Sequence, residues 1–112
     1  MSKSYNPDRW VVLDFGDGLF KVLGGWYGGY LDSDHWRLNS GIVSINKGID
    51  DNGSEWFEFV GHSGSTYKCY VDFEGLTSLT SSILDSWKNK HDIEIIEFEG
   101  NVPENMLTLC SL

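Results

Sequence analysis

The segment Gly61-His62-Ser63-Gly64-Ser65 sets an imidazole beside a hydroxyl, the two groups that serine hydrolases use as general base and nucleophile. The elbow that exposes a catalytic serine has the pattern G-x-S-x-G between a strand and a helix, but here Ser65 replaces the last glycine. Adjacent residues of a strand point to opposite sides, which separates His62 from Ser63. We interpret the segment as a polar turn and predict that the protein is not an enzyme. A histidine-based activity of His62 with Ser63, or of His35, is the alternative.

Two other segments contain the residue types of a metal site. His35 follows Asp32 and Asp34, but a divalent ion needs three or more convergent ligands, and no second group has a recognisable spacing. The loop of residues 50–55 is rich in oxygen ligands but lacks the alternating spacing of a calcium loop. We predict no metal and no cofactor.

Acidic residues form two groups along the chain, and these are the strongest candidates for a binding site. From residue 92 to residue 104 there are five carboxylates and no Lys or Arg. The predicted partner-binding residues of this run are Asp92, Glu94, Glu97 and Glu99. A second group, on a predicted hairpin, consists of Asp50, Asp51, Glu55 and Glu58. Trp56 and Tyr70 are the expected aromatic anchors, since desolvated aromatic side chains carry much of the energy of interfaces.

The net charge restricts the partners. Seventeen Asp and Glu against eight Lys and Arg give a formal charge of −9, which repels nucleic acid and anionic membranes. We predict a non-enzymatic acidic binding protein or inhibitor whose partner is a basic, nucleic-acid-processing protein. Ordinary solvated surface is the other interpretation of these charges. A small carbohydrate- or ligand-binding domain that uses the aromatic residues Trp26, Tyr27 and Tyr30 is the alternative function.

The elements that would position these residues form an α+β domain. Short apolar runs punctuated by glycine predict an antiparallel, strongly twisted β-meander of about five to six strands over residues 9–71. Apolar residues at three- and four-residue steps predict one amphipathic helix over 76–90, with Thr77 or a neighbouring serine as its cap, packed on one face of the sheet. Residues 92–98 are predicted to be a C-terminal strand and residues 99–112 a tail.

Composition indicates one folded domain over residues 1–112. The chain has 40% hydrophobic residues, with five Trp, five Tyr and six Phe, which is incompatible with a disordered chain. The N-terminal residues lack the apolar run of a signal peptide, so we expect a cytoplasmic protein. In that compartment Cys69 and Cys110 are expected to be reduced, although a disulfide between them is conceivable.

Three segments carry a resemblance to known proteins. The segments of residues 6–12 (NPDRWVV), 36–42 (WRLNSGI) and 63–69 (SGSTYKC) look like parts of small proteins of bacteria and their phages that have no assigned function. The likeness covers about two thirds of the chain and includes no catalytic motif. In size and acidity the chain is also similar to toxin-immunity proteins and phage anti-defence inhibitors. This likeness implies a toxin or a defence enzyme as the basic partner.

Overall fold

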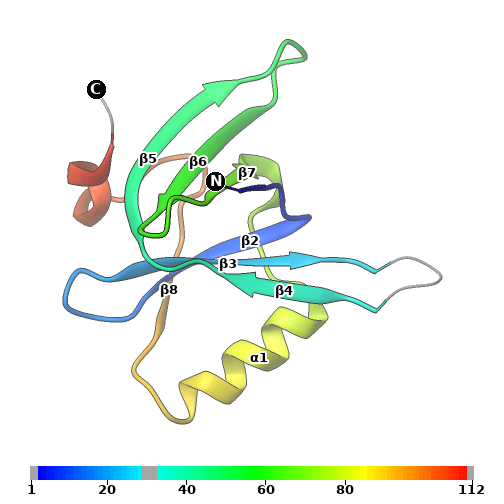
Figure 1. Ribbon diagram of the computed structural model, residues 1–112, viewed down its shortest axis with the longest axis vertical. Coiled ribbons are helices and arrows are strands. Elements are labelled where there is room, and N and C mark those ends of the chain that lie inside the picture. Colours follow the sequence, from blue (N-terminus) through cyan, green and yellow to red (C-terminus); the bar gives the residue numbers. More distant parts are fainter. Residues whose placement is uncertain (1–2, 29–32, 111–112) are drawn as a thin grey trace.

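The computed structural model describes residues 3–28 and 33–110, and in this part of the chain it is an α+β fold in three layers. Eight strands form two four-stranded sheets, and one α-helix covers the far side of the second sheet (Figure 1). The α+β class and the single α-helix of the sequence prediction are therefore confirmed.

The first sheet, called the outer sheet here, has the strand order β1-β7-β6-β5. Its strands are β1 (Ser4–Tyr5), β7 (Thr66–Tyr70), β6 (Glu55–Gly61) and β5 (Ile42–Ile49). The second, called the central sheet, has the order β4-β3-β2-β8. Its strands are β4 (His35–Leu38), β3 (Phe20–Trp26), β2 (Arg9–Asp14) and β8 (Glu94–Ile96). The helices are η1 (Val71–Phe73), α1 (Ser78–Lys88) and η2 (Glu104–Leu109), of which η1 and η2 are 3₁₀.

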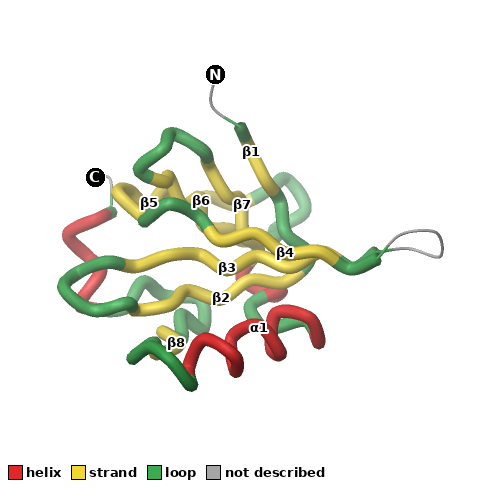
Figure 2. The backbone as a smooth tube through the Cα atoms, turned by 60° about the horizontal axis from the view of Figure 1, so that its bottom comes forward, coloured by secondary structure: helices red, strands yellow, loops and turns green. Residues whose placement is uncertain are grey.

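The prediction of a single meander with five to six strands is wrong, because the strands separate into two sheets. After β4 the chain leaves the central sheet, and β5, β6 and β7 build the outer one (Figure 2). The pairing of β1 with β7 is parallel, which a meander of consecutive strands does not contain. The burial of β2 shows the physical reason: all four residues from Trp10 to Leu13 are buried, so this strand has a core on each face.

The larger core lies between the two sheets, and half of its twelve buried residues are aromatic. Trp10 is completely buried there, and the centroids of its rings lie 5.5 to 6.3 Å from those of Phe57, Phe59 and Phe98. Residues of β2 at even positions face this core, whereas Val11 and Leu13 belong to a smaller core under the helix. The central sheet is thus packed on both sides.

Helix α1 begins with a capping box. The Thr77 hydroxyl accepts a hydrogen bond from the Thr80 backbone N–H, and the Thr80 hydroxyl accepts one from the backbone N–H of Thr77. Both threonines lie against Gly25 of β3, where an added Cβ would stand 2.9 Å from each of their methyl groups. The cap therefore fits only because β3 presents no side chain at this point. The helix was predicted over residues 76–90, and α1 is shorter by two residues at each end.

The segment after the helix differs from the prediction of a strand over 92–98 and a tail. Only Glu94–Ile96 pair with β2, and Phe98 turns into the core between the sheets, 3% exposed. Beyond it, η2 buries Met106, and Cys110 forms a parallel bridge with Ile45 of β5. The tail is therefore docked up to residue 110. Cys69 and Cys110 are free thiols.

Candidate protein-binding surface

An ordered group of aromatic and charged side chains surrounds Asp50, at the end of β5. The Asp50 carboxylate accepts hydrogen bonds from the Tyr70 hydroxyl (2.6 Å) and the Trp56 Nε1 (3.1 Å). Lys68 Nζ lies 3.4 Å from the same carboxylate and forms an ion pair with it. Three residues of the predicted partner-binding set, Asp50, Trp56 and Tyr70, are thus brought into one cluster, together with a lysine that the sequence did not single out.

Sheet register explains why these residues meet. Trp56 of β6 stands opposite Tyr70 of β7, and Glu58 stands opposite Lys68, so all four side chains point away from the core. The hairpin loop from Asp50 to Ser54 then returns the chain to β6: the Asp50 backbone N–H donates to the Ser54 carbonyl oxygen. This hydrogen bond closes the loop and holds the Asp50 carboxylate beside the rings of Trp56 and Tyr70.

The Trp56 indole rests directly on the backbone of β5. A Cβ built on Gly48 would lie 2.4 Å from the indole, so only glycine leaves room for the ring. Lys68 Nζ lies 4.9 Å from the Trp56 ring centroid and 5.3 Å from that of Tyr70. Trp56 and Tyr70 are half-buried and held in place within the free protein.

The cluster continues beyond β7 through residues that the sequence prediction missed. The Phe73 ring of η1 makes an edge contact with Tyr70 at 6.0 Å, and the Arg9 guanidinium stands 5.8 Å from the Phe73 centroid. Trp56, Lys68, Tyr70, Phe73 and Arg9 therefore form a ladder of aromatic rings with a cation between the first two and another at the end. One sequence signal could have identified Phe73 as a surface residue. It lies between two acidic residues, Asp72 and Glu74, in a connector outside the periodic apolar runs.

The surroundings of Asp50 lower the pKa of its carboxyl group from the ordinary value of 3.8. The hydrogen bond from Tyr70 is the main cause, and the hydrogen bond and charge of Lys68 add to it, against an opposing effect of desolvation. The folded state therefore favours the ionised form of Asp50. Its contribution to stability is present above the ordinary pKa and is lost as the pH falls through the lower, folded value.

We expect acid to destabilise the wild type more than an Asp50→Asn variant below about pH 4, because asparagine accepts hydrogen bonds without titrating there. Urea unfolding at several pH values between pH 2 and pH 6 measures the slope of stability against pH. Asp51→Asn is the control, because no hydrogen bond or ion pair involves the Asp51 side chain within the described residues, and it is expected to change the slope less than Asp50→Asn. Equal slopes for the wild type and Asp50→Asn would contradict this assignment.

Most of the other carboxylates have no cationic partner. Among the described residues, Lys68–Asp50 is the single ion pair. Four of the basic side chains, Arg9, Lys21, Arg37 and Lys68, lie over aromatic rings, and only Lys68 also forms the ion pair. Rings rather than carboxylates therefore contact most of these cations, which leaves most of the negative charge of the described surface outside ion pairs.

The remaining predicted site residues fall into three places. Asp51 and Glu55 are exposed at the hairpin, and Glu58 is half-buried beside Asn46, whose Nδ2 donates to its carboxylate at 3.2 Å. Glu97 and Glu99 line a hollow with Glu74, whose carboxylate accepts the backbone N–H groups of Phe98 and Glu99. Asp92 and Glu94 are exposed at the opposite end of β8, where Glu94 pairs with Asp14. The structure therefore does not gather all ten residues on one patch.

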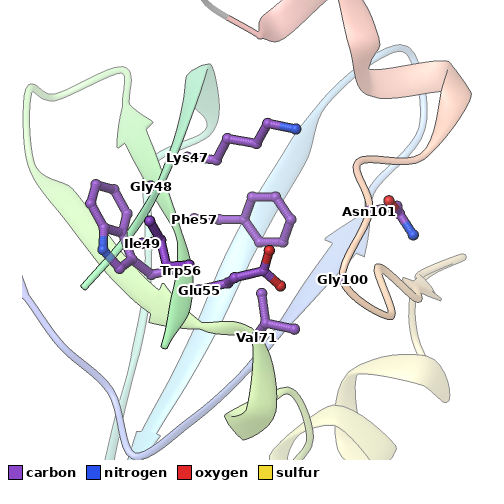
Figure 3. A pocket seen from close by; sticks show the side chains of 9 residues that line it. All are labelled: Lys47, Gly48, Ile49, Glu55, Trp56, Phe57, Val71, Gly100 and Asn101. Atoms are coloured by element: carbon purple, nitrogen blue, oxygen red, sulfur yellow. The ribbon is translucent and has the colours of Figure 1, made fainter. Parts of the chain in front are cut away.

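A hollow at the open end of the two-sheet core links the hairpin with the second acidic run. It has a volume of about 400 Å³ and is lined by Glu55 and Val71 on one side and by Gly100 and Asn101 on the other. Figure 3 shows Lys47, Glu55 and Phe57 on the side that faces Asn101, with the Trp56 indole on the other side of the strands. Glu55 and the turn that follows Glu99 thus border one opening. We call Asp50, Asp51, Glu55, Asp72 and Glu99, with the rings of Trp56, Tyr70 and Phe73, the acidic end.

The residues considered for catalysis or metal binding, His62, Ser63 and His35, lie in a turn and in a ring stack. His62 and Ser63 lie in the turn between β6 and β7, where their backbone N–H groups donate to the Gly41 carbonyl and the Ser40 hydroxyl. The His35 ring stacks on Trp26, with the centroids 5.6 Å apart. Within residues 3–28 and 33–110 no group of three His, Cys, Asp or Glu side chains is placed to hold a metal ion. Asp32 lies outside the described residues.

One of the three aromatic residues of the carbohydrate alternative, Trp26, is engaged by neighbouring rings. It stacks on His35 and makes a T-shaped contact with Tyr5, and its Nε1 donates to the Asn6 carbonyl oxygen. Tyr27 is 54% exposed, and Tyr30 lies outside the described residues. One face of the Trp26 indole is thus covered by His35.

Comparisons with models of protein families, with curated proteins and with solved structures found no match to this chain. The resemblance of its segments to small bacterial and phage proteins therefore stays a prediction. No helix in the described residues is both long enough and apolar enough to cross a membrane.

Proposed function

We propose that this protein binds a basic protein partner through its acidic end and acts without catalysis. The partner class is a nucleic-acid-processing protein, such as a toxin or a defence enzyme, whose basic surface the carboxylates would cover. The observation that carries the proposal is the lack of internal neutralisation: one ion pair in the described chain against a net charge of −9. Such a surface attracts a basic partner and raises the rate of association.

The rigid rings give the acidic end a second property of binding surfaces. Trp56 and Tyr70 are fixed by Asp50 and Gly48 before any partner arrives, so little side-chain entropy remains to be lost on binding. Asp51 and Glu55, on the hairpin that carries Trp56, and Glu99, beside the turn across the hollow, are exposed carboxylates. Charge would guide the encounter, and the preorganised rings would supply contact area.

The test compares two triple variants with the same change in net charge. The first, Asp51→Asn with Glu55→Gln and Glu99→Gln, neutralises the acidic end. The second, Asp17→Asn with Asp85→Asn and Glu104→Gln, neutralises exposed residues elsewhere. Association rates are measured against a panel of purified basic nucleases and DNA-processing enzymes at low and at physiological salt.

We expect the first variant to associate about tenfold more slowly with a cognate partner at low salt, because steering depends on charges at the interface. The second variant is expected to stay within about twofold of the wild type, since its charges lie outside the acidic end and salt screens charges away from the contact. Equal losses in both variants would show only a general charge effect, and unchanged rates in the first would overturn the proposal. A panel in which the wild type binds no basic protein also counts against it.

A further inference from the structure

A small pocket beside η1 has walls of two chemical kinds. Its volume is about 240 Å³, and it is lined by the acidic residues Asp50, Glu55 and Asp72 and by the rings of Tyr70 and Phe73, with Asn52 and Ser54 at the hairpin loop. Pockets for small-molecule ligands usually measure about 300–1,000 Å³. The size of this one therefore suits a single side chain.

The Phe73 ring is the unusual wall of this pocket. It is 46% exposed, although large apolar side chains of this protein are mostly buried and a ring gains by leaving water. The chain itself shows which group this ring accepts, since the Arg9 guanidinium already stands 5.8 Å from its centroid. The ladder that begins at Trp56 thus ends on a partly open aromatic surface.

The acidic residues determine which side chain would complete the ladder. Asp72 is exposed, and neither its carboxylate nor that of Glu55 forms a hydrogen bond or ion pair within the described residues. A guanidinium is planar, stacks on aromatic rings and donates several hydrogen bonds to carboxylates in a fixed geometry. A lysine ammonium is a more strongly hydrated point charge and gains less from such a wall.

We propose that this pocket receives an arginine side chain of the basic partner, stacked against Phe73 and hydrogen-bonded to the carboxylates of Asp72 and Glu55. The proposal rests on the proposed function, because it names the group by which that partner is recognised. Charge complementarity between the guanidinium and the two acidic lining residues outside the ion pair, Glu55 and Asp72, supports arginine as the occupant.

The experiment titrates ¹⁵N-labelled protein with three peptides and records amide chemical shifts. The peptides are acetylated and amidated Gly-Ser-X-Ser-Gly, where X is arginine, lysine or citrulline, the last being a neutral analogue of arginine. We expect the arginine peptide to produce saturable shifts at residues 50–55 and 70–74. The lysine peptide is expected to bind at least threefold more weakly, and the citrulline peptide is expected to give no saturable shift.

Two substitutions and a matched control test the walls. Phe73→Ala is expected to weaken the arginine peptide at least fivefold, and Phe73→Trp to restore binding to within twofold of the wild type. Leu107→Ala removes another apolar side chain of similar exposure, 52%, and is expected to leave binding unchanged. The amide spectrum of each variant away from residues 70–74 shows whether the fold is kept.

Equal affinity for the arginine and lysine peptides, shifts spread over all acidic residues, or wild-type binding by Phe73→Ala would each overturn the arginine pocket. Any of these results together with slower association of the acidic-end triple variant would remove the pocket and leave the proposed function standing. Normal association of that triple variant together with arginine-specific shifts would remove the proposed function and leave the arginine pocket standing.

Discussion

Replacement of Trp10 by alanine is expected to lower the free energy of unfolding by about 3–5 kcal/mol, as is typical of large aromatic residues in a core. Trp10 has no exposed surface and touches three phenylalanine rings, two from the outer sheet and one from the segment after β8. A cavity at this position would separate the two sheets at their centre. With a total stability of about 5–15 kcal/mol for a domain of this kind, much of the folded population would be lost.

Urea denaturation followed by far-UV circular dichroism measures this effect. Trp10→Phe separates packing from hydrogen bonding, because it keeps an aromatic ring and removes the Nε1 donor to the Tyr70 carbonyl oxygen (2.7 Å). We expect it to cost about 1–3 kcal/mol, because the part-buried Tyr70 carbonyl oxygen loses its donor and the smaller ring fills less of the core. Trp36→Ala is the control: Trp36 is 41% exposed and should cost clearly less. A Trp10→Ala variant as stable as Trp36→Ala would contradict the two-sheet core.

Replacement of Phe98 by alanine is expected to have the second-largest effect, again about 3–5 kcal/mol. The Phe98 ring lies 5.2 to 5.7 Å from the rings of Trp10, Phe57 and Phe59 and is the anchor of the chain that leads from β8 to η2. Its backbone N–H also donates to Glu74, so loss of the ring would loosen the turn at Glu99 and Gly100.

This substitution should therefore change the acidic end as well as the stability. Hydrogen exchange of the amides at residues 97–101 measures the local loosening, and urea unfolding measures the global cost. Ile49→Ala serves as the control, since Ile49 of β5 is 63% exposed and its loss creates no cavity in the core. In a double-mutant cycle with Trp10→Ala we expect a coupling of at least about 0.5 kcal/mol, because the two rings are in contact. Strict additivity of the two substitutions would argue against that contact.

Local patterns were sufficient for most of the individual elements. The helix was expected over residues 76–90 and is found at Ser78–Lys88, with the expected cap at Thr77, because its apolar spacing and capping residues are properties of the segment itself. The alternating run of residues 55–61 became β6 for the same reason, and the glycines beside Trp26 indeed mark a close approach. The hairpin at Asp50–Ser54 also formed where polar turn residues interrupt two strands.

Local patterns did not predict which segments that are distant in sequence pair or pack together. Alternation identifies the buried face of a strand only when the other side is polar, and the run at Trp10–Leu13 is apolar throughout. That β2 is covered on both sides follows from the positions of β6 and α1, which are far from it in sequence. The same holds for the parallel contact of β1 with β7 and for the insertion of Phe98, because the sequence contains no local trace of either.

For the candidate site, the amino-acid sequence alone contains the residue types: an excess of carboxylates, two acidic segments, and the aromatic residues Trp56 and Tyr70 near one of them. The folded chain sets which of these residues meet: Asp50 pairs with Lys68, Phe73 joins the ladder, and Glu55 and the turn after Glu99 border one opening. Charge and apolar content belong to each residue and add along the chain. The partner of a given charge depends on sheet register and on which layers pack together, and both are set by long-range contacts.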